Sequence, residues 1–421
     1  MRVLLFRNLC DRGGVSSSML LLGREMEKRG IEGEYWFLKG SDRLPDFEAT
    51  GRVTVAPLSA LAARLERGDV DVVQMTASDP AAEVVSMMAR VTPAKVLVTA
   101  RGALADIWDR TNCFAYSAIS KGMATVNQPY TDVQIEVVRN AIDIDRFAPA
   151  TSPSGGGAPI VAFVGRTSDA IKDFPRFTRI ASRLVARGAR VWIADPHRAG
   201  WETFVGKPVE QVETERWEQV PHESIADFYR AVAASGGVVL MTSRHEGFGN
   251  VAPEAAACGA WVVAPDVMGL NEAIIDGVTG NLFPADASDD DAAELIAGWM
   301  SAPRDSRQTS DAARREFSSP KMMDAYESIY SREQQLLFKG ASPVAGQRYE
   351  KLDAHLAKQR TWRAAAAREA AIELAGDGRT QLALGALGIA FRAEPSDFLS
   401  KQGFGQLLST MRRIPRRRAG V

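Results

Sequence analysis

Short apolar runs alternate with amphipathic stretches along the first part of the chain. Runs of five to seven mainly apolar residues have the length and composition of buried strands, and they lie at 2–6, 70–75, 94–100 and 115–120. The segment after the first run, 15–29, has helical spacing and is followed by Gly30, a common helix stop. Strands that alternate with helices predict βαβ units and a parallel sheet.

The same pattern begins again after a polar segment. Further strands are predicted at 160–165, 189–194, 236–242 and 260–265, with a helix at 174–188. The intervening stretch, APATSPSGGGAP at 148–159, is rich in Pro, Gly and Ser and has no apolar period, which is typical of a linker. We therefore expect two similar α/β domains, at 1–148 and 160–310, joined by a linker at 149–159. Ligands bind beyond the carboxyl ends of such strands, so a cleft between the domains is expected.

The C-terminal part is composed mostly of helix-forming residues. Residues 311–340 are predicted to form a return helix that packs toward the first domain, and 341–421 a helical appendage with a tail. Within it, 383–397 is either part of a plain helical appendage or half of a tetratricopeptide-type repeat, which needs neighbours to bury its faces. The appendage carries 14 Lys/Arg against 7 Asp/Glu, whereas the remaining residues carry 37 against 45. Its arginine-rich end at 412–421 is either a contact for an anionic partner or a solvated terminus.

Composition indicates a globular protein that contains no membrane span. Of the 421 residues, 46% are hydrophobic and 24% charged, and no apolar run approaches the ~18 residues of a transmembrane helix. The three cysteines, Cys10, Cys113 and Cys258, have neither disulfide-framework nor metal-site spacing. We therefore expect a cytoplasmic protein without a structural metal.

Two glutamates eight residues apart are the first candidates for chemistry. In SRHEGFGNVAPEAAACG (243–259), a predicted strand ends at Ser243 and a helix follows with Pro253 in its first turn. Glu254, at the start of that helix, either stabilises its own helix or accepts hydrogen bonds from two neighbouring hydroxyls such as those of a ribose. Glu246 lies just past the strand end. Its flanking glycines, Gly247 and Gly249, allow backbone N–H groups to approach a ligand.

Several motifs in order resemble those of the family 4 retaining glycosyltransferases. The segment 243–284 is similar to the family's signature of two glutamates separated by seven residues, a helix of small residues and a following Gly-rich strand motif. Supporting similarities lie at 11–30, 137–147, 164–175 and 224–249. The resemblance covers about residues 1–338. It implies an α/β protein of the GT-B fold, with two Rossmann-like domains facing a cleft; the C-terminal helical appendage at 341–421 lies beyond the resemblance.

The resemblance also implies roles for individual residues. The donor would be a nucleoside diphosphate sugar, a co-substrate, with no other cofactor and no metal. Arg166 and Lys172 match the family's basic pair, which would contact the diphosphate, and the Glu246 carboxylate would contact the transferred sugar. The remaining donor-binding residues would be Gly13, Gly14, Gly247, Phe248, Gly249, Asn250, Val251 and the ribose-binding Glu254.

Several positions depart from the family pattern. The spacing from Arg166 to Lys172 is one residue longer than is common, Asp173 replaces a glycine, and Ala141 replaces another. Arg101 occupies the place of a first-domain histidine and is therefore a candidate cation near the leaving group, unless the acceptor site is rebuilt. Asp106 is a candidate acceptor-side carboxylate. Glu272 is either a further donor contact or a surface helix residue.

The sequence therefore predicts a retaining, metal-independent glycosyltransferase that acts in glycan or glycoconjugate synthesis. Alternatives on the same fold are a sugar-nucleotide epimerase or hydrolase, and an inactive sugar-nucleotide-binding protein. The acceptor is open among a glycan, a lipid-linked sugar, a modified nucleic-acid base and a protein. A homo-oligomer and an anionic partner for the C-terminal tail are further expectations.

Overall fold

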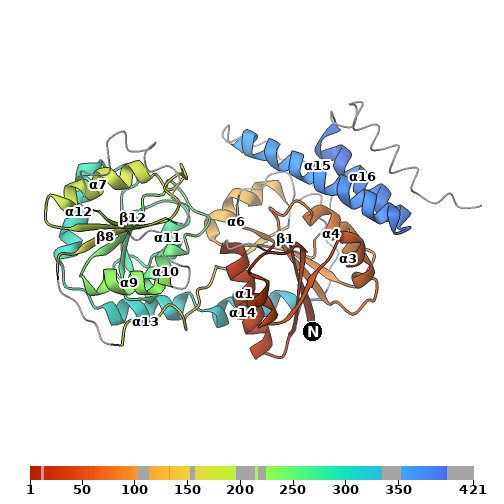
Figure 1. Ribbon diagram of the computed structural model, residues 1–421, viewed down its shortest axis with the longest axis horizontal. Coiled ribbons are helices and arrows are strands. Elements are labelled where there is room, and N and C mark those ends of the chain that lie inside the picture. Colours follow the sequence, from red (N-terminus) through yellow and green to blue (C-terminus); the bar gives the residue numbers. More distant parts are fainter. Residues whose placement is uncertain are drawn as a thin grey trace, which may run out of the picture. The chain divides into compact units, whose positions relative to one another are not determined.

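The computed structural model describes residues 1–10, 14–102, 113–131, 133–151, 157–195, 214–216, 224–333 and 352–395. The chain divides into two compact units (Figure 1). One unit consists of Met1–Val138 together with Met323–Val421, and the other consists of Arg139–Met322. The chain therefore leaves the first unit, forms the second, and returns to the first.

The first unit is built on a seven-stranded sheet in the order β3-β2-β1-β4-β5-β6-β7, in which every pairing is parallel. The strands are β1 (Arg2–Leu9), β2 (Glu32–Lys39), β3 (Arg52–Val55), β4 (Val72–Thr76), β5 (Lys95–Ala100), β6 (Ala115–Ala118) and β7 (Ile135–Val137). The connecting elements are α1 (Gly14–Lys28), α2 (Leu44–Glu48), α3 (Leu58–Leu65), α4 (Ala82–Ala89), α6 (Lys121–Asn127) and η1 (Gln128–Tyr130). The order reverses between β1 and β4, which makes their carboxyl ends a switch point, the usual ligand site of such sheets.

The second unit repeats this plan with a six-stranded parallel sheet in the order β10-β9-β8-β11-β12-β13. The strands are β8 (Ile160–Val164), β9 (Arg190–Ala194), β10 (Thr214–Arg216), β11 (Val238–Leu240), β12 (Trp261–Pro265) and β13 (Gly280–Phe283). The helices are α7 (Phe174–Val185), α9 (Ile225–Ala234), α10 (Val251–Ala257), α11 (Leu270–Ala273), α12 (Asp289–Ser301) and α13 (Ser306–Glu316), while α14 (Ser319–Tyr330) leads back to the first unit. Here the order reverses between β8 and β11.

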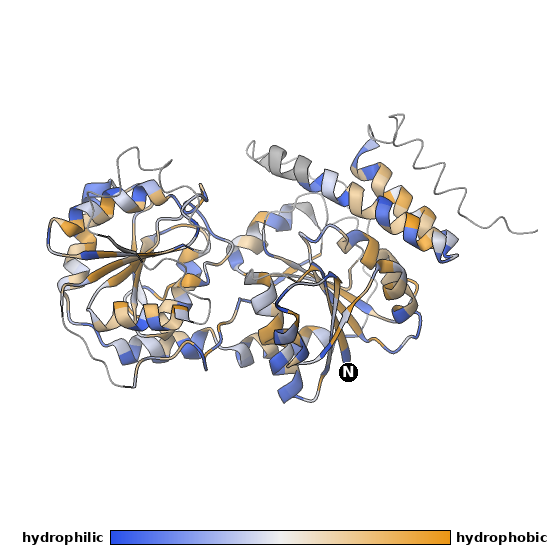
Figure 2. Ribbon diagram, in the orientation of Figure 1, coloured by the Kyte–Doolittle hydropathy of each residue, from blue (hydrophilic) through white to orange (hydrophobic). Residues whose placement is uncertain are grey.

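The hydrophobic pattern explains both sheets. Strands of a parallel sheet are covered by helices on both faces and therefore read as continuous apolar runs. Val3 to Phe6 in β1 are at most 1% exposed, and β4 is buried throughout. In Figure 2 the strands at the centre of each unit are mostly hydrophobic. The predicted α/β class with two Rossmann-like domains is confirmed.

A two-helix hairpin completes the first unit. It consists of α15 (Leu352–Gly376) and α16 (Thr380–Ala393), joined by a turn in which Gly378 has a φ of 74°. The helices meet along a stripe of alanines, which allows two backbones to approach closely, and the buried members are Ala364, Ala367, Ala371, Ala383, Ala386 and Ala390. The segment 383–397, which raised the repeat alternative, falls mainly in α16, the second helix of this hairpin.

The hairpin is docked on α3 and α4 (Figure 1). The Leu58 backbone N–H donates to Glu373 Oε2 at 3.0 Å, and Arg392 Nη2 lies 3.2 Å from Glu83 Oε1. A Cβ at Gly385 would lie 2.3 Å from Met87 Sδ, so a larger residue there would require the Met87 side chain to move. The predicted helical appendage is thus an integral part of the first unit over its described residues. The arginine-rich end at 412–421 lies outside the described residues.

None of the described helices combines the length and the apolar composition that crossing a membrane requires. The three cysteines are buried as free thiols.

Candidate functional site

The sequence-predicted donor residues gather at the switch point of the second sheet. β8 and β11 are neighbours in this sheet, and the loops that follow them are joined by direct hydrogen bonds. The Thr242 hydroxyl donates to the Lys172 carbonyl at 2.9 Å, and the Arg244 backbone N–H donates to the Ile171 carbonyl at 2.8 Å. Two loops that are distant in sequence are therefore fixed against each other at the carboxyl edge of the sheet.

Lys172 and Glu246 form an ion pair between these loops. The Lys172 Nζ atom lies 2.6 Å from Glu246 Oε1, and the two side chains are 19% and 14% exposed. The Ser243 hydroxyl donates to the same carboxylate oxygen at 2.8 Å, and the Glu246 N–H donates to the Met268 carbonyl at 2.9 Å. Both of these side-chain contacts use Oε1, so among the described residues no donor engages Oε2. The carboxylate is held in place with one oxygen available to a ligand.

Arg166 is placed differently from Lys172. Its Nη2 atom lies 2.6 Å from Asp169 Oδ2 in the same loop, and its side chain is 56% exposed. Arg166 and Lys172, which the family motif pairs, therefore differ in exposure and in their partners. Lys172 is fixed against the second glutamate loop, whereas Arg166 extends from the surface of its own loop.

Asp173 has an unusual backbone conformation. Its φ of 47° and ψ of 53° are left-handed, and among the described residues it is the only residue other than glycine with a positive φ. Its Oδ1 atom accepts from the Arg176 N–H at 3.3 Å as the N-cap of α7, and its Oδ2 atom lies 3.0 Å from Arg244 Nε. This conformation explains why glycine suits the position, and why aspartate, which tolerates it better than most residues, substitutes here.

Glu254 lies in the first turn of α10 and is largely buried. Burial raises its pKa to about 7, while Arg146, the Tyr229 hydroxyl and Lys172 act in the opposite direction by favouring the charged form. Burial also raises the pKa of Tyr229 well above its usual value. The Glu254 carboxyl is therefore partly protonated near neutral pH, in a setting that a hydrogen-bonding ligand would change.

The loop between the two glutamates is set by glycine and by one buried ring. Gly249 has a φ of 89°, and a Cβ there would lie 2.7 Å from Leu270 Cδ2. Phe248 is only 2% exposed, and its ring centroid lies 5.8 Å from that of Phe317. Its side chain therefore belongs to the core, and only its backbone remains as a donor-binding group. Gly247 is partly exposed in the same loop.

The loop ends where α10 begins. Val251 is the first residue of this helix, and the Asn250 side chain precedes it. The Asn250 Oδ1 atom accepts a hydrogen bond from Asn140 Nδ2 at 3.1 Å. The Glu272 Oε2 atom lies 3.9 Å from Arg139 Nε. Arg139 pairs more closely with Glu316, at 2.9 Å.

The first unit holds Arg101 beside the first turns of α1. Arg101 Nη1 lies 3.2 Å from the Ser18 hydroxyl oxygen, and Arg7 Nη1 lies 2.7 Å from that of Ser16. Burial lowers the pKa of Arg101, and the nearby Arg7 acts in the same direction. Gly14 is the first residue of α1. Gly13 and Asp106 lie outside the described residues.

Sequence reasoning missed the residues that support the predicted ones. Ser243 was identified only as a strand end, although it donates to Glu246. Tyr229 and Arg146 surround Glu254, and Arg7 accompanies Arg101. Ser243 and Arg7 could have been found from the sequence, because each is a polar residue at the carboxyl end of an apolar run. Tyr229 gave no such signal, because its helical spacing is that of an ordinary core residue.

Comparison with known proteins supports this interpretation of the second unit. Residues 147–316 match the family described as glycosyl transferases group 1. The D-inositol 3-phosphate glycosyltransferase of Kribbella flavida is 34% identical over 184 residues, which cover 39% of this chain and 42% of that protein. The protein of the same name from Mycolicibacterium smegmatis is 33% identical over 213 residues, covering 47% and 48%. The chain thus matches less than half the length of these relatives.

Solved structures extend the similarity to more than three quarters of the chain. A glycosyltransferase from Rickettsia africae has a TM-score of 0.66 at 17% identity, covering 78% of this chain and 97% of that one. HepE of Anabaena in complex with UDP-glucose has a TM-score of 0.60 at 17% identity, covering 79% and 100%. At these identities the likeness shows the fold. Taken with the match over residues 147–316, it shows a chain of the GT-B fold whose second unit is similar to the group 1 glycosyltransferases.

Proposed function

We propose that this protein is a retaining glycosyltransferase that moves a sugar from a nucleoside diphosphate sugar to an acceptor hydroxyl. The observation that carries the proposal is the Lys172–Glu246 pair, with 2.6 Å between Nζ and Oε1, at the switch point of the second sheet. These residues lie within the region that matches the family. A cation and a carboxylate fixed together suit a reaction that separates a diphosphate from a positively charged sugar.

The charges at this site match those that develop during transfer. The Lys172 ammonium has three N–H donors, of which one faces Glu246, so the others remain to stabilise a leaving diphosphate. Arg166 is exposed, and exchanging its Asp169 partner for a phosphate costs little because surface ion pairs are weak. Glu246 Oε2 would contact the sugar and stabilise positive charge as the glycosidic bond loosens.

Glu254 would bind the ribose of the donor. Its ionised carboxylate accepts hydrogen bonds from two neighbouring hydroxyls, which compensates for the burial that raises its pKa. Loop backbone N–H groups near Gly247 and Gly249 would complete the diphosphate contacts. No step in this scheme requires a metal ion.

The acceptor and the location of the reaction are further proposals. We propose an acceptor of the carbohydrate class, in glycan or glycoconjugate synthesis, because relatives of the second unit are named for transfer to inositol 3-phosphate, a polyol. Nucleic-acid and protein acceptors are the competing candidates. The three free thiols fit a reducing compartment, so we place the reaction in the cytoplasm.

A donor screen tests the proposal. UDP-glucose is the first candidate, since the structural relative HepE has been solved with it, and other nucleotide sugars follow. Acceptor-dependent nucleotide release supports transfer, and proton NMR of the first product from an α-linked donor should show an α-linkage. A β-linked product would contradict retention. Acceptor-independent release, epimerised donor, or binding without turnover would favour a hydrolase, an epimerase or a sensor, respectively.

A further inference from the structure

A cavity lies in the first unit, between the C-terminal hairpin and the edge of the sheet. Its volume is about 660 Å³, which falls within the range of about 300–1,000 Å³ typical of small-molecule sites. One wall is formed by α15, and the opposite wall by residues at the carboxyl ends of three strands, Asn8 of β1, Lys39 of β2 and Val55 of β3. Pro80, which follows β4, also lines it. The cavity therefore includes the β1–β4 switch point of this sheet.

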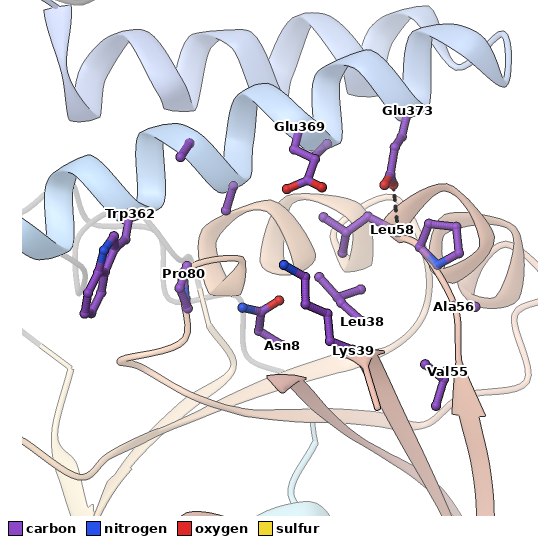
Figure 3. Close-up of a pocket in the computed structure, with 14 residues that line it drawn as sticks. Asn8, Leu38, Lys39, Val55, Ala56, Leu58, Pro80, Trp362, Glu369 and Glu373 are labelled. Atoms are coloured by element: carbon purple, nitrogen blue, oxygen red, sulfur yellow. Dashed lines mark hydrogen bonds between the residues drawn. The ribbon is translucent and has the colours of Figure 1, made fainter. Parts of the chain in front are cut away.

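Polar side chains enter the cavity from both walls. In Figure 3, Glu369 and Glu373 extend from α15 toward the strand ends, and Lys39 and Asn8 extend from the strand ends. Glu373 anchors the helix, because its Oε2 atom accepts from the Leu58 N–H at 3.0 Å. Within the described part of the chain, the side chains of Lys39, Asn8 and Glu369 have no hydrogen bond or ion pair to another residue. Three hydrogen-bonding groups are therefore available to a ligand.

The cavity also has an aromatic end. Trp362 lies on α15 close to Pro80 in Figure 3, and its side chain is 49% exposed, which is unusual for so large an apolar group. A flat aromatic ring beside carboxylate, amide and ammonium groups is suited to a sugar. The C–H face of a pyranose can pack on the indole while its hydroxyls meet Glu369, Asn8 and Lys39.

The charges favour an uncharged ligand over a phosphorylated one. Two carboxylates and one ammonium line the cavity, so an added phosphate would be repelled more than attracted. The excess of basic residues in 341–421 led to the expectation of an anionic partner for the C-terminal tail. The described part of that appendage instead presents two glutamates to this cavity.

We propose that this cavity binds the acceptor of the glycosyl transfer, an uncharged saccharide, and that the C-terminal hairpin exists to build it. This inference rests on the proposed transferase function and specifies its acceptor class. Trp362 is the stacking platform, and Glu369, Asn8 and Lys39 bind the hydroxyls. Without α15, the strand ends would retain Asn8 and Lys39 but would lose the aromatic ring and both carboxylates.

Saccharide binding to the full chain tests the inference. The probes are glucose, mannose, N-acetylglucosamine and maltose, with D-inositol 3-phosphate as the anionic comparison, each measured by saturation-transfer NMR titration. We expect a neutral saccharide to bind, and Trp362→Ala to weaken its binding about tenfold, as truncation of an aromatic anchor does. Glu369→Gln should weaken it less. Phe391→Ala is the matched control, because Phe391 has the same 49% exposure on α16 but does not line the cavity.

Three results would overturn the inference. They are no binding by any neutral probe, tighter binding of D-inositol 3-phosphate than of the neutral probes, and Trp362→Ala behaving like Phe391→Ala. Nucleotide-sugar binding is measured on the same samples by calorimetry and should be unchanged in all three variants. Failure of the proposed function has a different signature, since the wild-type chain would then bind no nucleotide sugar, whatever the saccharide result.

Discussion

Replacing Glu254 with glutamine should stabilise the second unit and at the same time impair donor binding. Glutamine keeps the size of the side chain and one of its two oxygens, but it removes the ionisable group. The pKa of Glu254 is raised from 4.5 to about 7 in the folded protein, mainly by burial. A carboxylate whose folded pKa is raised destabilises the folded state wherever it is ionised, so removing the ionisable group should stabilise the fold.

The magnitude follows from linkage between protonation and folding. Between pH 4.5 and 7 the folded state binds more protons at Glu254 than the unfolded state does, so stability falls as pH rises through this window. A shift of about 2.5 pKa units corresponds to about 3.5 kcal/mol at ~1.4 kcal/mol per unit. The side chain retains some exposure, so we expect about 2 kcal/mol. Glu254→Gln should gain this amount at pH 8 and almost nothing at pH 4.5.

Urea unfolding of wild type and variant at both pH values measures this difference. Calorimetry at pH 8 with the nucleotide sugar that binds the wild type should show donor affinity weakened by 1–3 kcal/mol, because an amide cannot replace a carboxylate that accepts from two hydroxyls. A stability difference that is the same at both pH values would refute the titration argument. Unchanged donor affinity would remove Glu254 from the donor site.

Lys172→Ala and Arg166→Ala should each lower kcat in a steady-state assay while leaving the melting temperature nearly unchanged, with the larger loss of kcat at Lys172. A variant with a lowered melting temperature and an unchanged kcat would show that its residue is structural. Because the Glu254 carboxylate ionises near pH 7, nucleotide-sugar affinity should rise about tenfold from pH 6 to pH 8 in calorimetry, and a flat profile would argue against a ribose-binding carboxylate. Asp173→Ala should destabilise by about 2 kcal/mol through lost capping and left-handed strain, whereas Asp173→Gly should stay within about 0.5 kcal/mol; equal urea midpoints for the two would contradict the strain argument. A chain ending at Gly340 should still bind the donor in calorimetry but lose saccharide transfer, and full transfer would leave the hairpin without a role at the acceptor.

Much of the fold could be predicted because its causes are local. Apolar runs such as Val3–Phe6 can be covered only between two layers of helices, and alternation with helices favours parallel strands. Element ends were less predictable. The strand expected at 236–242 is formed only at Val238–Leu240, because Gly236, with a φ of 72°, still belongs to the preceding turn.

The candidate site was predictable in its residues but not in its contacts. Glu246, Glu254 and Lys172 were identified from motif order, and chain position alone placed Glu254 in the first turn of a helix. The raised pKa of Glu254 was not predictable, because it depends on burial beside Arg146 and Tyr229, which are distant in sequence. Likewise, Phe248 was assigned to the donor loop, but its ring packs on Phe317 in the core.

The sequence by itself determined the parallel α/β architecture and the identity of the charged groups, since these depend on periodicity and residue type. Only the tertiary structure decided which of those groups meet. Lys172 and Glu246 are 74 residues apart and share a 2.6 Å contact because their strands are neighbours in the sheet. Asn8 and Trp362 line one cavity because the C-terminal hairpin folds back on the first unit. Contacts of this kind follow from strand order and helix docking, which a linear pattern of hydrophobic positions does not encode.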